Sequence, residues 1–128
     1  MLLQEKKIYH NCFEAQLLED DIFYLYFLPD SHATEVEYRL GYAAYNELRD
    51  NRVLYIIVEK GRFASLDKSA REYLQNNKFE ALASAVVLHS LSQRIIFNFY
   101  LKFRNQAYPT KGFNSMTDAK EWIKSLDL

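Results

Sequence analysis

Hydroxyl and carboxylate side chains gather in one short segment, from Ser65 to Ser69, which follows a buried strand and begins a helix. If Asp67 is the N-cap of that helix, Ser69 lies in the first turn, where free N–H groups and the helix dipole would stabilise a phosphate. Lys68 and Arg71 are close enough in sequence to help neutralise that phosphate. The simpler interpretation is that Ser65 and Asp67 cap the helix, each contributing at most about 1 kcal/mol. The segment is therefore either a switch loop or a helix cap.

The other residues capable of chemistry are scattered. His10, His32 and His89 fall in different predicted elements and have no spacing typical of a zinc site. Cys12 and His10 share one face of a predicted strand, but no third group or oxyanion donor accompanies them. We therefore expect no catalytic residues, no metal and no cofactor, and we expect that the protein is not an enzyme.

Length and composition predict one domain over residues 1–128, and 49% of the 128 residues are hydrophobic, enough for a substantial core. Apolar runs of strand length alternate with helical segments, which is typical of an α/β fold with a parallel sheet. Alternating apolar residues on either side of the acidic turn 19–21 indicate an antiparallel hairpin at the start. We expect about five strands (Lys7–Leu17, Ile22–Leu28, Val53–Val58, Ala83–Leu88 and Lys111–Phe113) and four helices (Ala33–Arg49, Lys68–Asn77, Ser92–Phe103 and one starting at Ser115 or Thr117).

The first predicted helix has two stripes at helical spacing. We expect the aliphatic stripe to face the core; it consists of Val36, Leu40, Ala43, Ala44 and Leu48. The second stripe lies roughly opposite and consists of Tyr38, Tyr42 and Tyr45. Tyrosine contributes rigid contact area, so this stripe is a possible partner or dimer surface. The alternative is that the preceding hairpin or the chain ends cover it.

The third predicted helix, Ser92–Phe103, is apolar nearly all round and includes Phe97 and Tyr100 as further interface candidates. A surface helix normally has a polar half. Either neighbouring elements cover this helix, or its outer face binds a second subunit, a lipid-like tail or a membrane surface. We favour burial against the sheet together with self-association.

Charge and hydropathy bear on the class of partner. Net charge is −1, yet residues 1–50 hold four Lys/Arg and ten Asp/Glu, whereas residues 51–128 hold twelve and seven. The four cations between Arg94 and Lys111 are interleaved with aromatic residues but are too few to indicate a nucleic-acid-binding protein. The longest apolar-rich run, Ile95–Leu101, is too short for a transmembrane segment. With a single cysteine and no secretory-type leader, we expect a cytoplasmic protein.

Several phrases of the second half resemble a known family. They are SLDKSAREYL from Ser65, AVVL from Ala85, NFYLKF from Asn98, PTKGF from Pro109 and AKEWI from Ala119. In these phrases and in the order of its elements, the chain resembles the bacterial STAS-like domains, also called SpoIIAA-like or STAS/SEC14-like, and in particular their uncharacterised single-domain members. The resemblance covers about Val53 to Ile123 well and the first half in outline.

This resemblance implies a STAS-like sheet with helices packed on it, and a non-enzymatic regulatory module that binds a protein partner or itself as a homodimer. In the anti-sigma-factor antagonists of this fold, a kinase phosphorylates a serine directly after an aspartate. Here Lys68 follows Asp67, and Ser69 stands one position later. The alternative function is a carrier of a small apolar ligand or lipid. A cavity beside Ile96, Phe99 and Tyr100 would favour the carrier.

Overall fold

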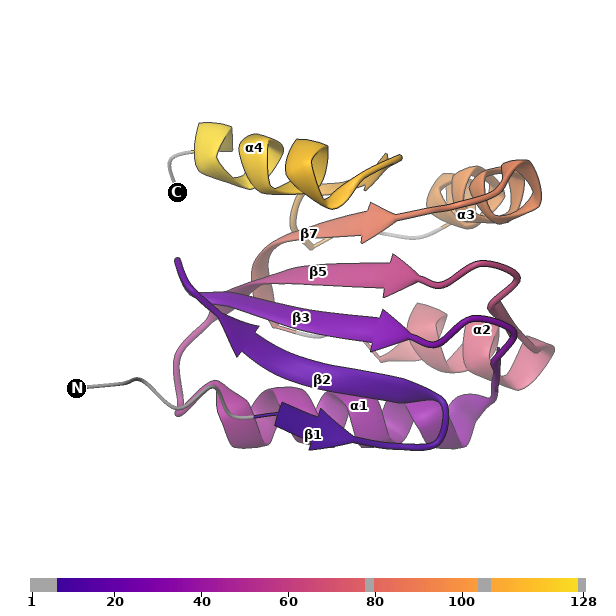
Figure 1. The fold of residues 1–128 in the computed structure, drawn as a ribbon, viewed down its shortest axis with the longest axis horizontal. Helices are drawn as coiled ribbons and strands as arrows, with labels where there is room; N and C mark the ends of the chain where they lie inside the picture. Colours follow the sequence, from indigo (N-terminus) through magenta and orange to yellow (C-terminus); the bar gives the residue numbers. More distant parts are fainter. Residues whose placement is uncertain (1–6, 78–79, 104–106, 127–128) are drawn as a thin grey trace.

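The computed structural model describes residues 7–77, 80–103 and 107–126. A six-stranded mixed sheet forms the centre, with strand order β1-β2-β3-β5-β7-β8. β1 and β2 are antiparallel to their neighbours, whereas β3, β5, β7 and β8 are parallel, so their carboxyl ends share one edge (Figure 1). The sheet strands are β1 (Lys7–Tyr9), β2 (Phe13–Leu18), β3 (Ile22–Phe27), β5 (Leu54–Lys60), β7 (Ala81–Val87) and β8 (Thr110–Phe113).

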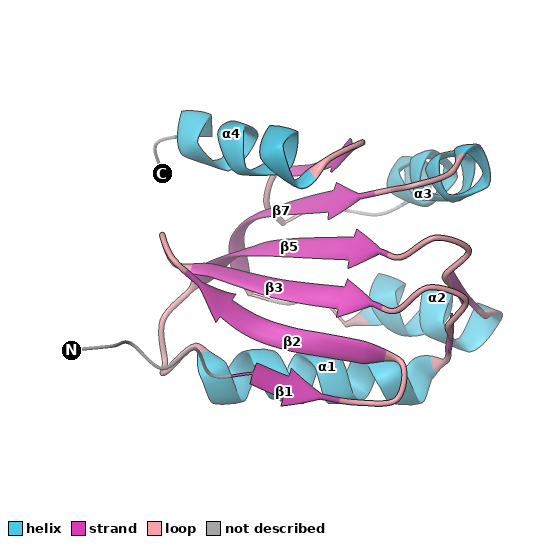
Figure 2. Cartoon of the chain, in the orientation of Figure 1, coloured by secondary structure: helices cyan, strands magenta, loops and turns pink. Residues whose placement is uncertain are grey.

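Four helices cover the sheet (Figure 2): α1 (Glu35–Leu48), α2 (Lys68–Asn76), α3 (Leu91–Phe103) and α4 (Met116–Leu126). Each parallel strand is added at the same edge as its predecessor, with α1, α2 and α3 as the connections. Because crossovers between parallel strands are right-handed, these three helices are expected on one face. α4 follows the last strand and packs on the opposite face.

Alternation along the strands divides the core into two layers. In β5, Leu54 and Ile56 face the α1 and α2 side, while Ile57 lies with Ala119 and Ile123 of α4. The largest fully buried side chains of the first layer are those of Tyr45 and three phenylalanines, Phe13, Phe23 and Phe27. The expected α/β architecture is therefore confirmed. The sheet has six strands where about five were expected, because the first predicted strand is two strands.

The chain reverses within the predicted strand Lys7–Leu17. His10 N–H donates to the carbonyl of Phe13 at 2.8 Å, and Cys12 N–H donates to His10 Nδ1 at 3.1 Å. β1 and β2 consequently pair with each other as a second hairpin. The sequence lacks a glycine or proline at this turn, and the histidine ring takes the place of the usual turn residue as hydrogen-bond acceptor.

The two predicted stripes of α1 do not divide between core and surface as expected: Ala44 and Leu48 of the aliphatic stripe are buried, but its other members are exposed. Tyr38 and Tyr45 are buried, whereas Val36 and Leu40 are 55% and 41% exposed. The buried face includes Gly41, where an added Cβ would lie 3.2 Å from a methyl group of Leu25. Small residues on that face bring the helix close to the sheet, and the tyrosine rings fill the space on either side. Tyr38 and Tyr45 are thus core residues, and the prediction that they form an interface is wrong.

Tyr42 is half-buried and packs against the same core. Tyr45 keeps its hydroxyl hydrogen-bonded inside the protein: the hydroxyl donates to the carbonyl of Glu80 and accepts from Leu54 N–H at 3.2 Å. A tyrosine can therefore face the core of this fold wherever backbone groups at the sheet end meet its hydroxyl.

A second, two-stranded sheet joins the loops that precede α1 and α2. It pairs β4 (His32–Ala33) with β6 (Ser65–Leu66) in parallel, and it was not expected from the sequence. Gly61 permits this approach, since a Cβ there would lie 2.5 Å from the carbonyl oxygen of Phe27. The two helix N-termini are therefore held side by side.

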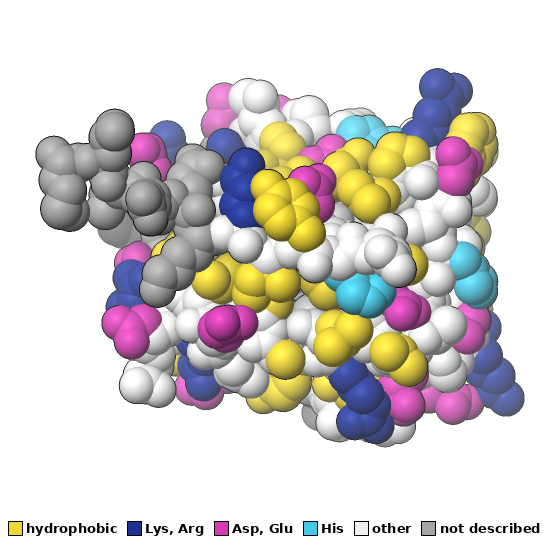
Figure 3. Space-filling view, turned by 60° about the horizontal axis from the view of Figure 1, so that its bottom comes forward, with side chains coloured by type: hydrophobic (Ala, Val, Ile, Leu, Met, Phe, Trp, Pro, Cys, Tyr) yellow, Lys and Arg dark blue, Asp and Glu magenta, His cyan; other side chains and the backbone are white. Residues whose placement is uncertain are grey.

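The face shown in Figure 3 has hydrophobic side chains scattered among charged side chains of both signs. This view brings forward the bottom of the molecule, along which α1 lies. Isolated exposed apolar residues of this kind are ordinary on protein surfaces and do not indicate a binding site.

Candidate functional site

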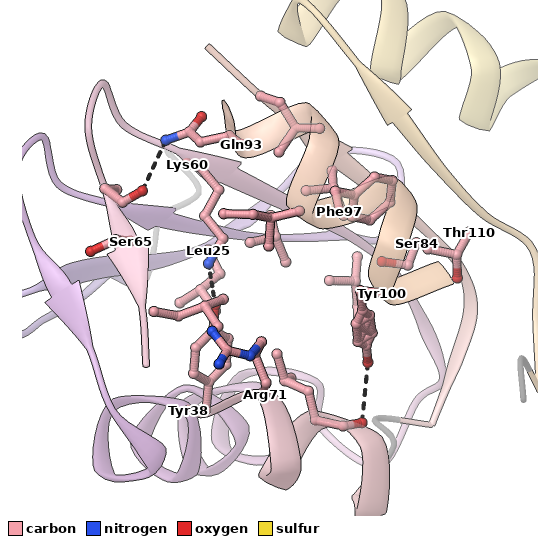
Figure 4. Close-up of a pocket in the computed structure, with 18 of the residues that line it drawn as sticks. Leu25, Tyr38, Lys60, Ser65, Arg71, Ser84, Gln93, Phe97, Tyr100 and Thr110 are labelled. Carbon is pink, nitrogen blue, oxygen red and sulfur yellow. Dashed lines mark hydrogen bonds between the residues drawn. The ribbon is translucent and has the colours of Figure 1, made fainter. Parts of the chain in front are cut away.

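α3 is anchored to its surroundings at both ends. At its first turn, the Gln93 side-chain amide donates to the carbonyls of Gly61 and Ala64, both at 3.0 Å. Toward its other end, the Tyr100 hydroxyl donates to the carbonyl of Leu74 in α2 at 3.2 Å (Figure 4). These bonds fix the helix to the loop after β5 and to the second half of α2.

The middle of α3 reaches the sheet through Phe97. An added Cβ at Gly112 of β8 would lie 2.9 Å from Cε2 of Phe97, so the ring occupies the space that any other residue at position 112 would fill. Because Gly112 has no side chain, the Phe97 ring can pack directly against β8. Between this contact and the two ends, the helix does not fill the space above the central strands.

A cavity of about 310 Å³ lies between α3, α2 and the sheet. Its volume is at the lower end of the range of small-molecule sites. Most of the wall is apolar: the sheet supplies Leu25, Ile56, Val58 and Val86, and α3 supplies Ile96 and Phe97. The carrier prediction required a cavity beside Ile96, Phe99 and Tyr100. Ile96 and Tyr100 do line it, whereas Phe99 is 63% exposed on the outside of the helix.

Lys60 is the last residue of β5 and extends into this cavity. Its ammonium donates to the hydroxyl of Tyr38, as Figure 4 shows, and lies 4.2 Å from the centroid of the Phe27 ring. Burial lowers the pKa of Lys60 to about 7. Burial also raises the pKa of Tyr38, so the phenol stays neutral. The cavity thus contains an amine that gives up its proton far more readily than an exposed lysine does.

The loop after β5 brings an aromatic ring to the cavity at a conformational cost. Phe63 has a φ of 63°, in the left-handed region that bulky residues rarely adopt, and its ring is 64% exposed. Such a conformation costs on the order of 1 kcal/mol and persists only where neighbouring contacts hold it. Here Ala64 N–H donates to the carbonyl of Gly61 at 2.9 Å. The Gln93 side-chain amide donates to the carbonyls of Gly61 and Ala64. The loop and α3 therefore fix this side of the cavity together.

Comparison with known proteins establishes the family and the fold. Residues 16–127 match the family model described as "Domain of unknown function (DUF7793)". The chain belongs to this family. A comparison with curated proteins finds no match. Among solved structures, the chain is similar to an uncharacterized protein from Shewanella loihica PV-4, of the DUF3478 family and with a SpoIIAA-like fold. That protein is 15% identical, with a TM-score of 0.57, and the match covers 95% of this chain and 97% of that one.

At this identity the likeness concerns the fold alone, and it confirms the predicted STAS-like, SpoIIAA-like architecture. Half of the predicted site residues of this DUF7793 chain come together in the cavity, namely Tyr38, Ser65, Arg71, Phe97 and Tyr100. The other half do not line it, namely Tyr42, Tyr45, Asp67, Lys68 and Ser69. The predicted loop and the third helix thus contribute to one site.

Asp67 and Ser69 form hydrogen bonds at the N-terminal ends of α1 and α2. Asp67 is the N-cap of α2, as predicted, and accepts from Ala70 N–H at 2.9 Å. The Ser69 hydroxyl donates to Asp67 Oδ1 at 2.7 Å and accepts from Glu35 N–H of α1 at 3.1 Å. The hydrogen bonds that the Asp67 carboxylate accepts, chiefly from the Ser69 hydroxyl and then from Ala70 N–H, lower the pKa of Asp67. Lys68 is exposed, and its Nζ lies 3.7 Å from Oε1 of Glu72. Ser69 therefore joins α1 to α2, and the switch-loop interpretation stays a hypothesis beside this structural role.

Sequence reasoning missed Lys60, although a signal was present. Lys60 lies two residues beyond Val58 and four beyond Ile56, so strand alternation places it on their face of the sheet. The predicted strand ended at Val58, and the charge was assigned to the following loop. A strand extended to Lys60 would have put an amine on the same buried face.

Other functional predictions concern metals, membranes and nucleic acids. Among the described residues, no three His, Cys, Asp or Glu side chains lie together as a metal site would require. No helix in the described ranges is long and apolar enough to span a membrane. Residues 104–106, which include one of the four cations weighed for nucleic-acid binding, lie outside the described residues.

Proposed function

We propose that this chain is a non-enzymatic binding domain for a small, largely apolar molecule, which it holds between α3 and the sheet. The observation that carries the proposal is the cavity of about 310 Å³ with apolar walls from β3, β5, β7 and α3. Protein interiors are normally close-packed, so a space of this size on a core-facing side of a sheet needs an occupant or a function. The liquid volume of water, about 30 Å³ per molecule, makes this space equivalent to about ten waters.

The test is a titration with 1-octanol, whose nine non-hydrogen atoms suit this volume, followed by NMR of the methyl groups. Methyl signals of Ile56, Val58 and Val86 should shift, whereas those of Ile123 on the α4 face should stay in place. Uniform shifts on both faces, or none at saturation, would contradict the proposal.

A pocket-filling variant makes the titration specific. In Val86→Phe, the larger side chain enters the cavity from near the carboxyl end of β7, and octanol affinity should fall at least tenfold because the site is occupied. Val36→Phe makes the same change at an exposed position of α1, outside the cavity, and should bind like the unchanged protein. Equal binding by both variants would place the alcohol elsewhere.

A second function, self-association, is favoured by the outer face of α3. Leu91, Ile95 and Phe99 are 73%, 58% and 63% exposed there, and large apolar groups on one helix face are typical of an interface. We propose a second copy of the chain as the occupant, which fits the expected homodimer. Sedimentation should show a dimer that Ile95→Asp converts to monomer. A monomer at every concentration would remove this function and leave the cavity proposal intact.

A further inference from the structure

The cavity has an uneven distribution of charge, and this inference rests on the proposed binding function. Two cationic side chains, Lys60 from β5 and Arg71 from α2, line it. No aspartate or glutamate is among the described residues that line the cavity. An apolar site that contains positive charge and lacks acids is complementary to a ligand with an apolar body and an anionic end.

The surroundings of Lys60 leave its charge unneutralised. Its ammonium contacts the Tyr38 hydroxyl and two aromatic rings, at 4.2 Å from the centroid of Phe27 and 4.9 Å from that of Tyr38. No ion pair joins Lys60 to a carboxylate within the described part of the chain. An ammonium has three donors, and a buried charge is normally paired with a group of opposite sign. Such a pair is formed once a ligand brings its own anion.

Arg71 adds a second positive group at the same cavity. It extends from α2 toward the Lys60–Tyr38 pair in Figure 4, and its residue is exposed to solvent. A guanidinium remains charged at every pH at which the protein is folded. The cavity therefore keeps a positive potential even where Lys60 is deprotonated.

We propose that the cavity selects apolar carboxylic acids, with the Lys60 ammonium binding the carboxylate and the tail lying against Ile56, Val58 and Val86. A carboxylate suits the inner end of this site better than a phosphate ester does, because Arg71 is exposed to solvent and the Lys60 ammonium with the neutral Tyr38 phenol matches a single negative charge. The volume, equivalent to about ten waters, fits an acid with about ten non-hydrogen atoms. Octanoate has that size.

The proposal makes affinity depend on pH. Burial lowers the pKa of Lys60 to about 7, so the free protein loses the ammonium as the pH rises above that value. The other titratable or charged groups that line the cavity are Tyr38 from α1, Arg71 from α2, Tyr100 from α3 and Tyr108 before β8, and no carboxylate of the described residues is among them. Octanoate is ionised from pH 6 to pH 9. Its affinity should therefore decrease with pH, whereas that of 1-octanol should not.

The experiment compares octanoate with 1-octanol at pH 6 and pH 9, using methyl NMR to confirm the site. At pH 6 the unchanged protein should bind octanoate roughly tenfold more tightly than octanol, as expected for a hydrogen bond between charged groups. At pH 9 octanoate affinity should be roughly tenfold lower, and octanol affinity should change less than about twofold.

Lys60→Met keeps the apolar stem and removes the charge. It should remove the pH dependence and most of the preference for octanoate, with Arg71 supplying the remainder, while still binding octanol. Lys120→Met is the matched control, because Lys120 is exposed on α4 at the opposite face of the sheet, and it should behave like the unchanged protein. If Lys60→Met fails to fold, the pH series on the unchanged protein still decides the question.

The possible failures are distinguishable. Equal affinity of octanoate and octanol at pH 6, or a preference for octanoate that does not change with pH and persists in Lys60→Met, would overturn the inference and leave the apolar cavity as the binding site. If neither compound shifts the cavity methyl groups, the proposed function fails and this inference fails with it.

Discussion

Lys60→Met also makes a prediction about stability that needs no ligand. In the folded protein the pKa of Lys60 is lowered to about 7, while in the unfolded chain it has the ordinary value of 10.5. Between these two values the unfolded chain holds a proton at Lys60 that the folded protein has released. Stability increases with pH wherever the unfolded state binds more protons. The folded protein should therefore gain stability as the pH rises from 7 toward 10.5.

The magnitude follows from the two pKa values. One pKa unit corresponds to 1.36 kcal/mol, so the cost of burying Lys60 is about 4 kcal/mol at pH 7 and about 2 kcal/mol at pH 9. Methionine has no proton to lose. The free energy of unfolding of the unchanged protein, measured relative to Lys60→Met, should thus rise by about 2 kcal/mol between pH 7 and pH 9.

Urea denaturation at the two pH values measures this difference, because effects of other titrating groups cancel between the two proteins. Lys120→Met serves again as the control and should show a difference from the unchanged protein that does not vary with pH. If the Lys60→Met difference is equally constant, the amine is solvated in the folded protein, and the argument for a desolvated cation in the cavity is refuted.

Two pairs of substitutions test how the site is held. Gly112→Ala should lower the free energy of unfolding by about 1–3 kcal/mol, because the added methyl group meets the ring of Phe97. Gly41→Ala should be close to neutral, since alanine stabilises its helix by about 1 kcal/mol and this offsets the contact with Leu25. Thermal and urea unfolding of the two variants measure the difference. Ser69→Ala should cost about 1–2 kcal/mol because it leaves the first N–H of α1 without its acceptor, and the exposed Ser65→Ala should cost less than about 0.5 kcal/mol. A reversed order in either pair would mean that these contacts do not stabilise the helix positions.

Strand and helix order could be predicted because β3, β5 and β7 consist of apolar runs and because Asp67 and Ser115 cap helices in the expected way. Which face of α1 is buried could not be predicted in the same way. Periodicity counts Val36 and Leu40 as more apolar than tyrosine, but the close approach at Gly41 and the hydroxyl partners of Tyr45 decide which side is buried, and both depend on tertiary contacts.

The candidate site was predicted in pieces. Ser65, Arg71 and Tyr100 were singled out for a switch loop and an interface, yet they line one cavity because α2 and α3 meet at the carboxyl edge of the sheet. That meeting involves elements that are far apart in the sequence. The inward direction of Lys60 depends on where β5 ends, and element ends are the least certain feature of any sequence-based assignment.

The parallel pairing of β4 with β6 restricts how the sequence can vary in length. Each short strand lies in the connection that leads into a helix, so a residue inserted in one connection would shift one helix start against the other and separate Ser69 from its partner in α1. At the acidic tip between β2 and β3, Asp21 is tied to the start of β5 by Tyr55 N–H and Arg52, whereas Asp20 has a left-handed backbone in the solvent-exposed part of the turn and can accept inserted residues beside it. Relatives should thus differ in length at that tip and keep the two tied connections at constant length.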